Sequence, residues 1–217
     1  MDSTLNYKEI SIIEFGVAGG NGLVELEEIV GIIEKIYDLK IDIYGFDMGT
    51  GLTPPLDYRD LPFLFQEGFF PMDIDNLNKR LHKSKVILGP IDKTINDFIK
   101  SKPNPVAFIA FDMDLYSSTK ASFKLLESDS DLLLPRIHCY FDDIMGYSYS
   151  DFNGERLAIN EFNESHKQKK ISPIYGLNSF IWNSANWTEN IYMIHIFEHN
   201  LYCSNDGMLQ VPTLQLS

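Results

Sequence analysis

Four aspartates stand in two short segments, and each segment follows an apolar run. Asp112 and Asp114 lie in the first segment, and Asp142 and Asp143 lie in the second. Neither segment contains a lysine or an arginine, and an unpaired buried carboxylate costs several kcal/mol. The residue types therefore favour a hard divalent cation, and Mg²⁺ fits a site of few carboxylates. The alternative, Asp114 as a helix cap with solvated acids at 142–143, leaves the other carboxylates without an explanation.

A glycine-rich turn precedes these acids. It reads Glu14-Phe-Gly16-Val-Ala18-Gly-Gly20-Asn-Gly22, and glycines allow positive φ and a close approach of the backbone to a ligand. The spacing differs from the Gly-x-Gly-x-x-Gly of dinucleotide binding, which disfavours a nicotinamide-dependent oxidoreductase. It resembles instead the first motif of class I S-adenosylmethionine (SAM)-dependent methyltransferases, where an acid such as Glu14 helps to hold the charged groups of SAM. A turn that only packs a helix against a strand is the alternative.

Asp47 ends another apolar run, at 41–46. An acid at this place can accept hydrogen bonds from both ribose hydroxyls of an adenosine ligand, whether NAD or SAM. A turn cap before Gly49 is the alternative. The ligand-binding role of Asp47 is better supported because Asp47 follows the glycine turn in the sequence.

The elements that must position these residues are alternating strands and helices. Short apolar runs predict strands at 11–15, 41–46, 86–88, 106–112, 137–141, 180–182 and 191–197. Amphipathic spacing predicts helices at 23–37, 77–82, 94–100, 117–127 and 154–167. This alternation indicates an α/β protein with a parallel sheet, whose ligands bind at the carboxyl ends of the strands. The glycine turn and all the acids named above are therefore expected at one edge of the sheet.

Length and composition limit the function classes. The 217 residues predict a single domain over 1–217. Lys and Arg number 18 against 31 Asp and Glu, and the net charge of −13 argues against nucleic acid and anionic membranes as partners. No run approaches the roughly 20 apolar residues of a membrane span. With only two cysteines and no leader-like N-terminus, we expect a cytoplasmic protein.

Taken together, these motifs resemble the macrocin O-methyltransferase family, which are metal-dependent sugar and aminocoumarin-type O-methyltransferases. The resemblance is carried, in the family's order, by residues 14–22, 44–47, 51–52, 112–119, 142–143 and 154–162. It implies a Rossmann-like class I methyltransferase fold, with a mostly parallel twisted sheet, helices on both faces and an antiparallel strand near the C-terminus. It also implies SAM- and Mg²⁺-dependent methylation of a hydroxyl on a sugar or polyol-like small molecule, such as a natural product or a polysaccharide precursor.

The resemblance further implies a role for each matching residue. Asp112, Asp142 and Asp143 would be the metal ligands, and Asp114 would be the general base. SAM would be held by Glu14, Gly16, Ala18, Gly20, Asp47 and Asp112. Where the family tends to have Asp-Thr after the third strand, this chain has Lys93-Thr94, so we expect the adjacent Asp92 to contact the adenine.

Several alternatives stay open at this stage. One is a metal-independent methyltransferase in which Asp112 and Asp143 hold the substrate directly, and another is a non-catalytic SAM-binding interaction protein. The aromatic residues at 58–70 are expected either to anchor a loop or to form a substrate lid, and residues 144–152 are expected to contribute to the acceptor pocket. Residues 190–217 are expected to add an edge strand or a subunit contact, which leaves a homo-oligomer open.

Overall fold

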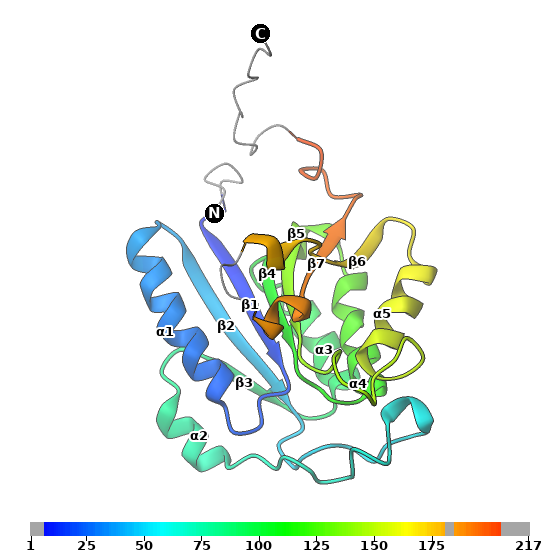
Figure 1. The fold of residues 1–217 in the computed structure, drawn as a ribbon. Helices are drawn as coiled ribbons and strands as arrows, with labels where there is room; N and C mark the ends of the chain where they lie inside the picture. Colours follow the sequence, from blue (N-terminus) through cyan, green and yellow to red (C-terminus); the bar gives the residue numbers. More distant parts are fainter. Residues whose placement is uncertain (1–6, 181–184, 205–217) are drawn as a thin grey trace.

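The structure, a computed structural model, describes residues 7–180 and 185–204. This part of the chain contains one seven-stranded sheet of order β3-β2-β1-β4-β5-β7-β6 (Figure 1). The strands are β1 (Glu9–Phe15), β2 (Lys40–Asp47), β3 (Lys85–Leu88), β4 (Val106–Phe111), β5 (Leu133–Phe141), β6 (Lys169–Pro173) and β7 (Ile191–Ile196). β7 pairs antiparallel with β5 and β6, and the other pairs are parallel. The sheet therefore confirms the prediction from the sequence.

Helices cover both faces of the sheet. The α-helices are α1 (Asn21–Ile36), α2 (Ile74–Arg80), α3 (Ile91–Lys100), α4 (Tyr116–Ser122) and α5 (Gly154–Ser165), and the 3₁₀ helices are η1 (Tyr58–Asp60), η2 (Phe123–Glu127), η3 (Ser130–Leu132), η4 (Leu177–Phe180) and η5 (Asn186–Asn190). Leu23 of α1 and Leu77 of α2 pack on one face, whereas Ile95 of α3 and Phe162 of α5 pack on the other. None of the described helices combines the length and apolar character needed to cross a membrane.

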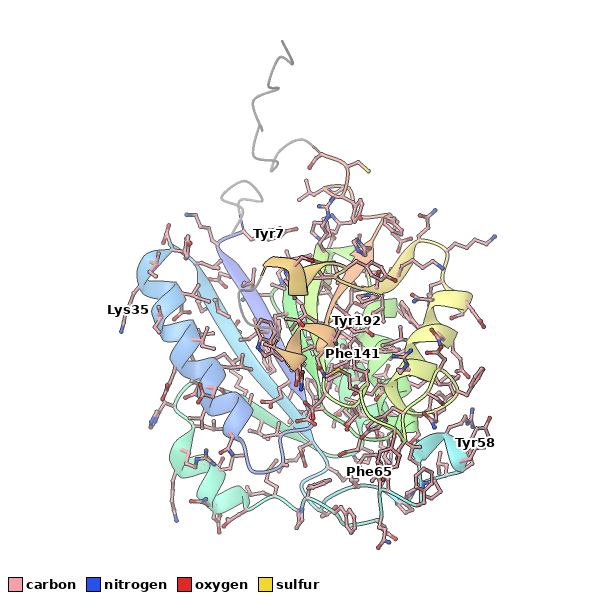
Figure 2. All side chains as sticks on the ribbon, in the orientation of Figure 1. Tyr7, Lys35, Tyr58, Phe65, Phe141 and Tyr192 are labelled. Carbon is pink, nitrogen blue, oxygen red and sulfur yellow. The ribbon has the colours of Figure 1, made fainter. Side chains whose placement is uncertain are left out.

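Strands β1 to β4 contribute to both hydrophobic cores because their side chains alternate between the faces, whereas the buried apolar residues of β5, β6 and β7 lie in one core. In β1, Ile12 packs in the α1 cluster and Phe15 in the cluster of α3, α4 and α5. On the latter face Phe15, Phe111 and Phe141 stack in a row, with ring centroids 5.5 and 4.5 Å apart. Figure 2 shows Phe141 in the interior near Tyr192, whose ring centroid is 5.3 Å away. This row fixes the carboxyl ends of β1, β4 and β5, directly before the residues of the candidate site.

Three differences from the sequence prediction lie in the C-terminal half. The expectation of an edge strand from residues 190–217 is wrong for β7, which lies between β5 and β6. The predicted strand 180–182 is wrong at Phe180, which ends η4, and its other residues lie outside the described residues. The strand at β6 was not predicted, because it has a single buried apolar residue, Ile171, between lysines and a serine. Its place at the edge of the sheet explains this composition, since an edge strand is covered by only one neighbour.

The loop between β2 and α2, residues 48–73, runs along the carboxyl edge of the strands (cyan in Figure 1). Asp60 fastens this loop to α4, because its carboxylate accepts hydrogen bonds from the Leu56 N–H at 2.8 Å and the Ser117 N–H at 2.8 Å. The Asp60 side chain is buried, and it satisfies an N–H in the first turn of α4 that has no partner within the helix. One aspartate thus connects the loop to the body of the protein.

We expect Asp60→Ala to lower the free energy of unfolding by about 2–4 kcal/mol, because it leaves two N–H groups without acceptors. Chemical denaturation measures this change. Asp97→Ala is the matched control, since Asp97 is exposed and pairs only with Lys100 on the same helix turn; its effect is expected to stay below about 1 kcal/mol. Equal losses for the two variants would contradict the anchoring role of Asp60.

Candidate active site

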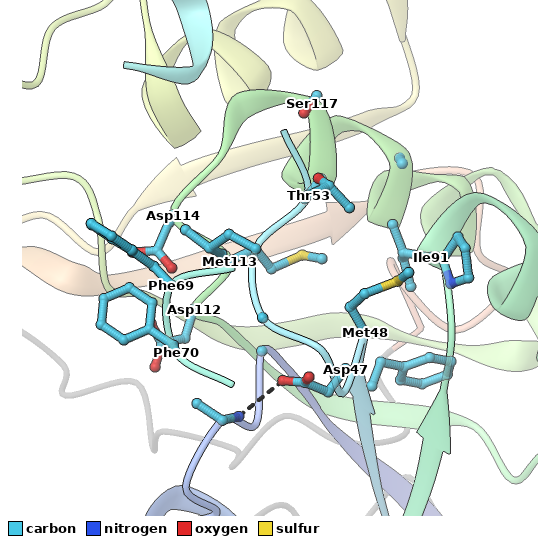
Figure 3. Close-up of a pocket in the computed structure, with 18 of the residues that line it drawn as sticks. Asp47, Met48, Thr53, Phe69, Phe70, Ile91, Asp112, Met113, Asp114 and Ser117 are labelled. Carbon is cyan, nitrogen blue, oxygen red and sulfur yellow. Dashed lines mark hydrogen bonds between the residues drawn. The ribbon is translucent and has the colours of Figure 1, made fainter. Parts of the chain in front are cut away.

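A cavity of about 530 Å³ opens at the carboxyl edge of the parallel strands. It lies between the β1–α1 turn, the end of β2, the β3–α3 turn, the β4–α4 turn and the loop 48–73 (Figure 3). The residues proposed from the sequence that line it are Gly16, Ala18, Asp47, Asp92, Asp112, Asp114 and Asp142. Three others, Glu14, Gly20 and Asp143, lie close by without lining it. The fold therefore brings the predicted set together at one edge.

Gly16 is a glycine because the β1–α1 turn lies against the β4–α4 turn. Its φ is +86°, and a Cβ at this position would stand 1.7 Å from the carbonyl oxygen of Asp112. Any larger residue would push the two turns apart. The glycine motif predicts that the backbone comes close to a ligand, but at Gly16 it comes close to the backbone of Asp112. This contact sets the position of Asp112.

Asp47 holds the glycine turn in place. Its Oδ2 accepts hydrogen bonds from the N–H groups of Val17 and Ala18, each at 2.9 Å, and its Oδ1 accepts one from Gly49 at 2.6 Å. One of these bonds is the dashed line at Asp47 in Figure 3. The turn cap that we weighed as an alternative is therefore present. A carboxylate has about four acceptor positions, so Asp47 keeps capacity for a ligand in the cavity as well.

Asp112, Asp142 and Asp143 form a cluster that we call the acid triad. One carboxylate oxygen of each lies within 4.8 Å of the others. The Tyr140 hydroxyl donates to Asp142 at 2.6 Å, and the Tyr149 hydroxyl donates to Asp143 at 2.9 Å. These tyrosines orient the carboxylates in the way that outer partners commonly orient metal ligands.

Asp143 is the most firmly held member of the acid triad. Its Oδ2 accepts the backbone N–H of Asp114 at 3.1 Å, and its own N–H donates to Oε2 of Glu155 at 3.1 Å. Glu155 is fully buried, and its Oε1 has no hydrogen-bond partner among the described residues. Burial, and next the charge of Asp143, raises the pKa of Glu155 well above its ordinary value, so Glu155 supports Asp143 through the hydrogen bond and not through a charge of its own.

Burial and mutual repulsion raise the pKa of two acids of the site, Asp112 and Asp114. Burial, then Asp142 and Asp143, raises the pKa of Asp112 to about 7. Burial, then Asp143 and the other triad members, raises the pKa of Asp114 to about 8. None of these four acids forms an ion pair with a lysine, arginine or histidine in the described part of the chain. The donor set, oxygens only and unneutralised, fits a hard divalent cation.

Asp114 stands apart from the acid triad and lines the cavity. Its backbone has φ +60°, a left-handed conformation that aspartate and asparagine tolerate better than most residues. The hydrogen bond from its N–H to Asp143 holds this conformation. Asp114 is therefore a neighbour of the acid triad but not a member of it. Its carboxylate accepts no side-chain hydrogen bond among the described residues.

Glu14 lies beneath the glycine turn. Its Oε1 would be 2.0 Å from a Cβ at Gly22, so Gly22 makes room for the carboxylate, and its Oε2 is buried without a hydrogen-bond partner among the described residues. Burial, then Asp112 and Asp47, raises the pKa of Glu14 to about 8. An unpartnered buried carboxylate at this place fits a cationic ligand such as the ammonium of SAM, although Glu14 itself does not line the cavity.

We expect Glu14→Gln to stabilise the ligand-free protein at pH 8 but not at pH 5. The pKa of Glu14 lies above its ordinary value of 4.5, so the wild type loses stability as the pH rises from about 5 to 8. The loss approaches about 1.4 kcal/mol per pH unit, and the glutamine variant lacks it. Thermal unfolding at several pH values measures the difference, with the exposed Glu25→Gln as control. The same pH dependence in all three proteins would contradict the assignment.

The other two SAM-binding candidates have different surroundings. Gly20 has φ +76° at the start of α1, and a Cβ there would meet the Leu77 side chain, so a packing reason for this glycine is sufficient. Asp92 lies in the first turn of α3 and lines the cavity beside Ile91. The adenine contact of Asp92 stays a prediction.

Sequence reasoning missed the residues that hold the acid triad. Tyr140, Tyr149 and Glu155 contact the triad, and Asn190 donates from its Nδ2 to the carbonyl oxygen of Asp142 at 3.1 Å. Two of them lie in segments already named from the sequence, Glu155 in the motif 154–162 and Tyr149 in the stretch 144–152, but neither was given this role. Residues 144–152 do not line the cavity, contrary to expectation. Their contribution is the Tyr149 hydroxyl on Asp143.

Comparison with solved structures establishes the fold. The crystal structure of CalS11, a calicheamicin methyltransferase, superposes with a TM-score of 0.62 at 21% identity, over 85% of this chain and 71% of that one. The O-methyltransferase NovP superposes with a TM-score of 0.58 at 13% identity, over the same shares. The chain has the class I methyltransferase fold. No protein-family model matches the sequence, and no curated protein matches it.

Proposed function

We propose that this protein is a SAM-dependent O-methyltransferase that acts on a hydroxyl of a sugar or polyol-like small molecule with the help of Mg²⁺. The observation that carries the proposal is the acid triad beside Asp114, in a cavity that also contains the glycine turn. The structurally similar CalS11 is a calicheamicin methyltransferase and NovP is an O-methyltransferase. Both likenesses are consistent with methyl transfer to oxygen here.

The proposed roles divide the cavity in two. Gly16, Ala18, Asp47 and Asp92 line the side that we assign to SAM, where Asp47 would bind the ribose and Asp92 the adenine. Gly20 would shape the turn around SAM, and Glu14 and Asp112 would hold its methionine part. Asp112, Asp142 and Asp143 would hold the cation, and Asp114 would face the acceptor. The two unpaired cysteines, Cys139 and Cys203, support the cytoplasmic location that we propose.

The chemistry needs a base, and we assign this role to Asp114 because it lines the cavity and its carboxylate has no side-chain hydrogen bond among the described residues. SAM, when bound, supplies a methyl group on a positively charged sulfur, which leaves as a neutral thioether. In the transfer, the acceptor oxygen would take the methyl group, and the electron pair of the broken sulfur–methyl bond would stay with the sulfur. Asp114 would accept the hydroxyl proton and pass it to water, so the products would be a methyl ether, S-adenosylhomocysteine (SAH) and a proton.

Mg²⁺, when bound, supplies the positive charge that favours the ionised forms of the hydroxyl and of Asp114. The chain itself contributes position: the hydrogen bond between Asp114 N–H and Asp143 ties the base to the acid triad. The cavity has an apolar wall, formed by Leu52, Met113, Phe69 and Phe70. Held geometry of this kind is a large part of enzymatic rate enhancement.

Calorimetry and a methyl-transfer assay test this proposal. We expect SAH to bind with and without Mg²⁺, and labelled methyl transfer from SAM to require a divalent cation. Transfer that survives EDTA would favour the metal-independent enzyme. Binding of SAH without transfer to any of a broad set of hydroxylated acceptors would favour the non-catalytic SAM-binding protein, and absence of SAH binding would reject all three.

A further inference from the structure

The aromatic residues of the loop 48–73 fall into two groups. Phe65 is only 6% exposed and packs with Leu61 and Leu115, so it anchors the loop. Phe69 and Phe70 line the cavity and are 40% and 53% exposed. Figure 3 shows them on the side of the cavity where Asp112 and Asp114 lie. These two rings are therefore not explained by loop anchoring.

The backbone holds both rings in place. Leu52 N–H donates to the Phe69 carbonyl at 2.8 Å, and Gly68 N–H donates to the Leu52 carbonyl at 2.9 Å. Gly51 permits this contact, since a Cβ there would stand 2.6 Å from the Phe69 oxygen. Phe70 has φ +59°, a conformation that costs about 1 kcal/mol or more for a non-glycine residue. Strain at an exposed phenylalanine beside a cavity is typical of a ligand-binding position.

The two rings are nearly perpendicular, so together they form an apolar corner and not one flat surface. Their centroids are 6.0 Å apart with an interplanar angle of 76°. Aromatic side chains at the mouth of a cavity bind the apolar face of a ring while nearby polar groups fix its substituents. The acid triad and Asp114 are the polar groups here. A pyranose ring has this combination, with C–H bonds on a face and hydroxyls at the rim.

The negative charge of the cavity argues against acceptors that carry a diphosphate, as nucleoside diphosphate sugars do. Among the described residues that line it, five are aspartates (Asp47, Asp92, Asp112, Asp114 and Asp142) and none is lysine, arginine or histidine. A single bound divalent cation leaves this set negative. The loop 48–73 contains one basic residue, Arg59, which is held by Asp57 and the Tyr116 hydroxyl. A diphosphate would therefore meet repulsion and find no cationic side chain on the cavity wall.

We propose that the acceptor is an uncharged or amino glycoside whose ring lies in the corner between Phe69 and Phe70, and that nucleoside diphosphate sugars are not acceptors. This inference rests on the proposed function, because it describes the acceptor side of the same cavity. It assigns Phe69 and Phe70 to acceptor binding, and it leaves SAM binding to the opposite side.

Ligand-observed NMR in the presence of SAH and Mg²⁺ tests the inference. The probes are the methyl glycosides of L-rhamnose, D-glucose, D-galactose and D-glucosamine, together with dTDP-L-rhamnose, UDP-glucose, UDP-galactose and UDP-glucosamine. We expect at least one methyl glycoside to bind, with saturation transferred mainly to the C–H groups of one ring face. Its nucleotide-linked counterpart is expected to bind at least about tenfold more weakly.

Substitutions in the loop test whether Phe69 and Phe70 contact the sugar ring, as distinct from a general disturbance of the loop. Phe69→Ala and Phe70→Ala are expected to weaken the bound glycoside about tenfold and to leave the SAH dissociation constant within about twofold. Phe63→Ala is the control, because Phe63 belongs to the same loop, is 73% exposed and does not line the cavity. Tyr58, at the outer margin in Figure 2, is a second such position.

Three results would overturn the inference while SAH still binds: no methyl glycoside binds, a nucleotide sugar binds more tightly than its methyl glycoside, or Phe63→Ala weakens binding as much as Phe70→Ala. The comparison of the two sugar classes uses the wild type, so it does not depend on the folding of a variant. Loss of SAH binding in the wild type would instead reject the proposed function itself.

Discussion

Asp114→Asn is expected to lower kcat by about 10³-fold while the SAH dissociation constant changes by less than about twofold. General base catalysis typically contributes about 10²–10⁴-fold, and the amide cannot take the hydroxyl proton. Asparagine tolerates the left-handed backbone at φ +60° and keeps the N–H that donates to Asp143. The variant therefore changes the proton acceptor and little else. Single-turnover methyl transfer with saturating SAM measures the effect.

The control for this variant is Asp151→Asn, since Asp151 is an exposed acid paired with Arg156 outside the cavity. It is expected to retain wild-type turnover. An Asp114→Asn protein with a rate within about threefold of the wild type would show that another group takes the proton. A large rise in the SAH dissociation constant would instead place Asp114 on the SAM side.

Asp142→Asn is expected to weaken Mg²⁺ or Mn²⁺ binding about 100-fold or more and to stabilise the metal-free protein. The pKa of Asp112 lies near 7 because of burial and, next, the charge of Asp142. Ionisation of Asp112 therefore opposes folding as the pH rises from about 4 to 7, and the variant relieves part of this cost. The free energy of unfolding of the variant is expected to exceed that of the wild type by about 1 kcal/mol at pH 8; the effect is this small because Asp112 is exposed and its charge is screened by solvent. Near pH 4 no difference is expected.

Thermal unfolding with EDTA and with Mg²⁺ measures both effects in one experiment. Mg²⁺ is expected to raise the Tm of the wild type and to leave that of Asp142→Asn nearly unchanged. Glu161→Gln is the control, because Glu161 is an acid paired with Lys120 away from the triad. A metal-free variant that is less stable than the wild type would contradict the repulsion on which the metal assignment rests.

The gathering of the acids could be predicted because it needs only the order of strands and the parallel direction. Apolar runs before Gly16, Asp47, Asp112 and Asp142 marked strand ends, and the carboxyl ends of parallel strands meet at one edge. The alternation of apolar residues along the strands accounts for the helices that cover both faces of the sheet. Most of the sheet followed from these local signals.

The supporting contacts could not be predicted because they depend on tertiary geometry. The hydrogen bond between Asp143 N–H and Glu155, and the contact of Gly16 with the Asp112 carbonyl, join segments whose relative positions no local pattern specifies. The strand β6 was missed because an edge strand needs little apolar sequence. The division of the loop aromatics into the anchor Phe65 and the exposed Phe69 and Phe70 likewise depends on how the loop 48–73 is folded.

The central claim is that the carboxylates of Asp112, Asp142 and Asp143 together hold one divalent ion. Anomalous diffraction at the manganese edge, from a crystal grown with SAH and soaked in Mn²⁺, tests it most directly. We expect a single peak bonded to an oxygen of each of the three side chains, within reach of the Asp114 carboxylate. Clear density for SAH with no anomalous peak among these residues would contradict the claim.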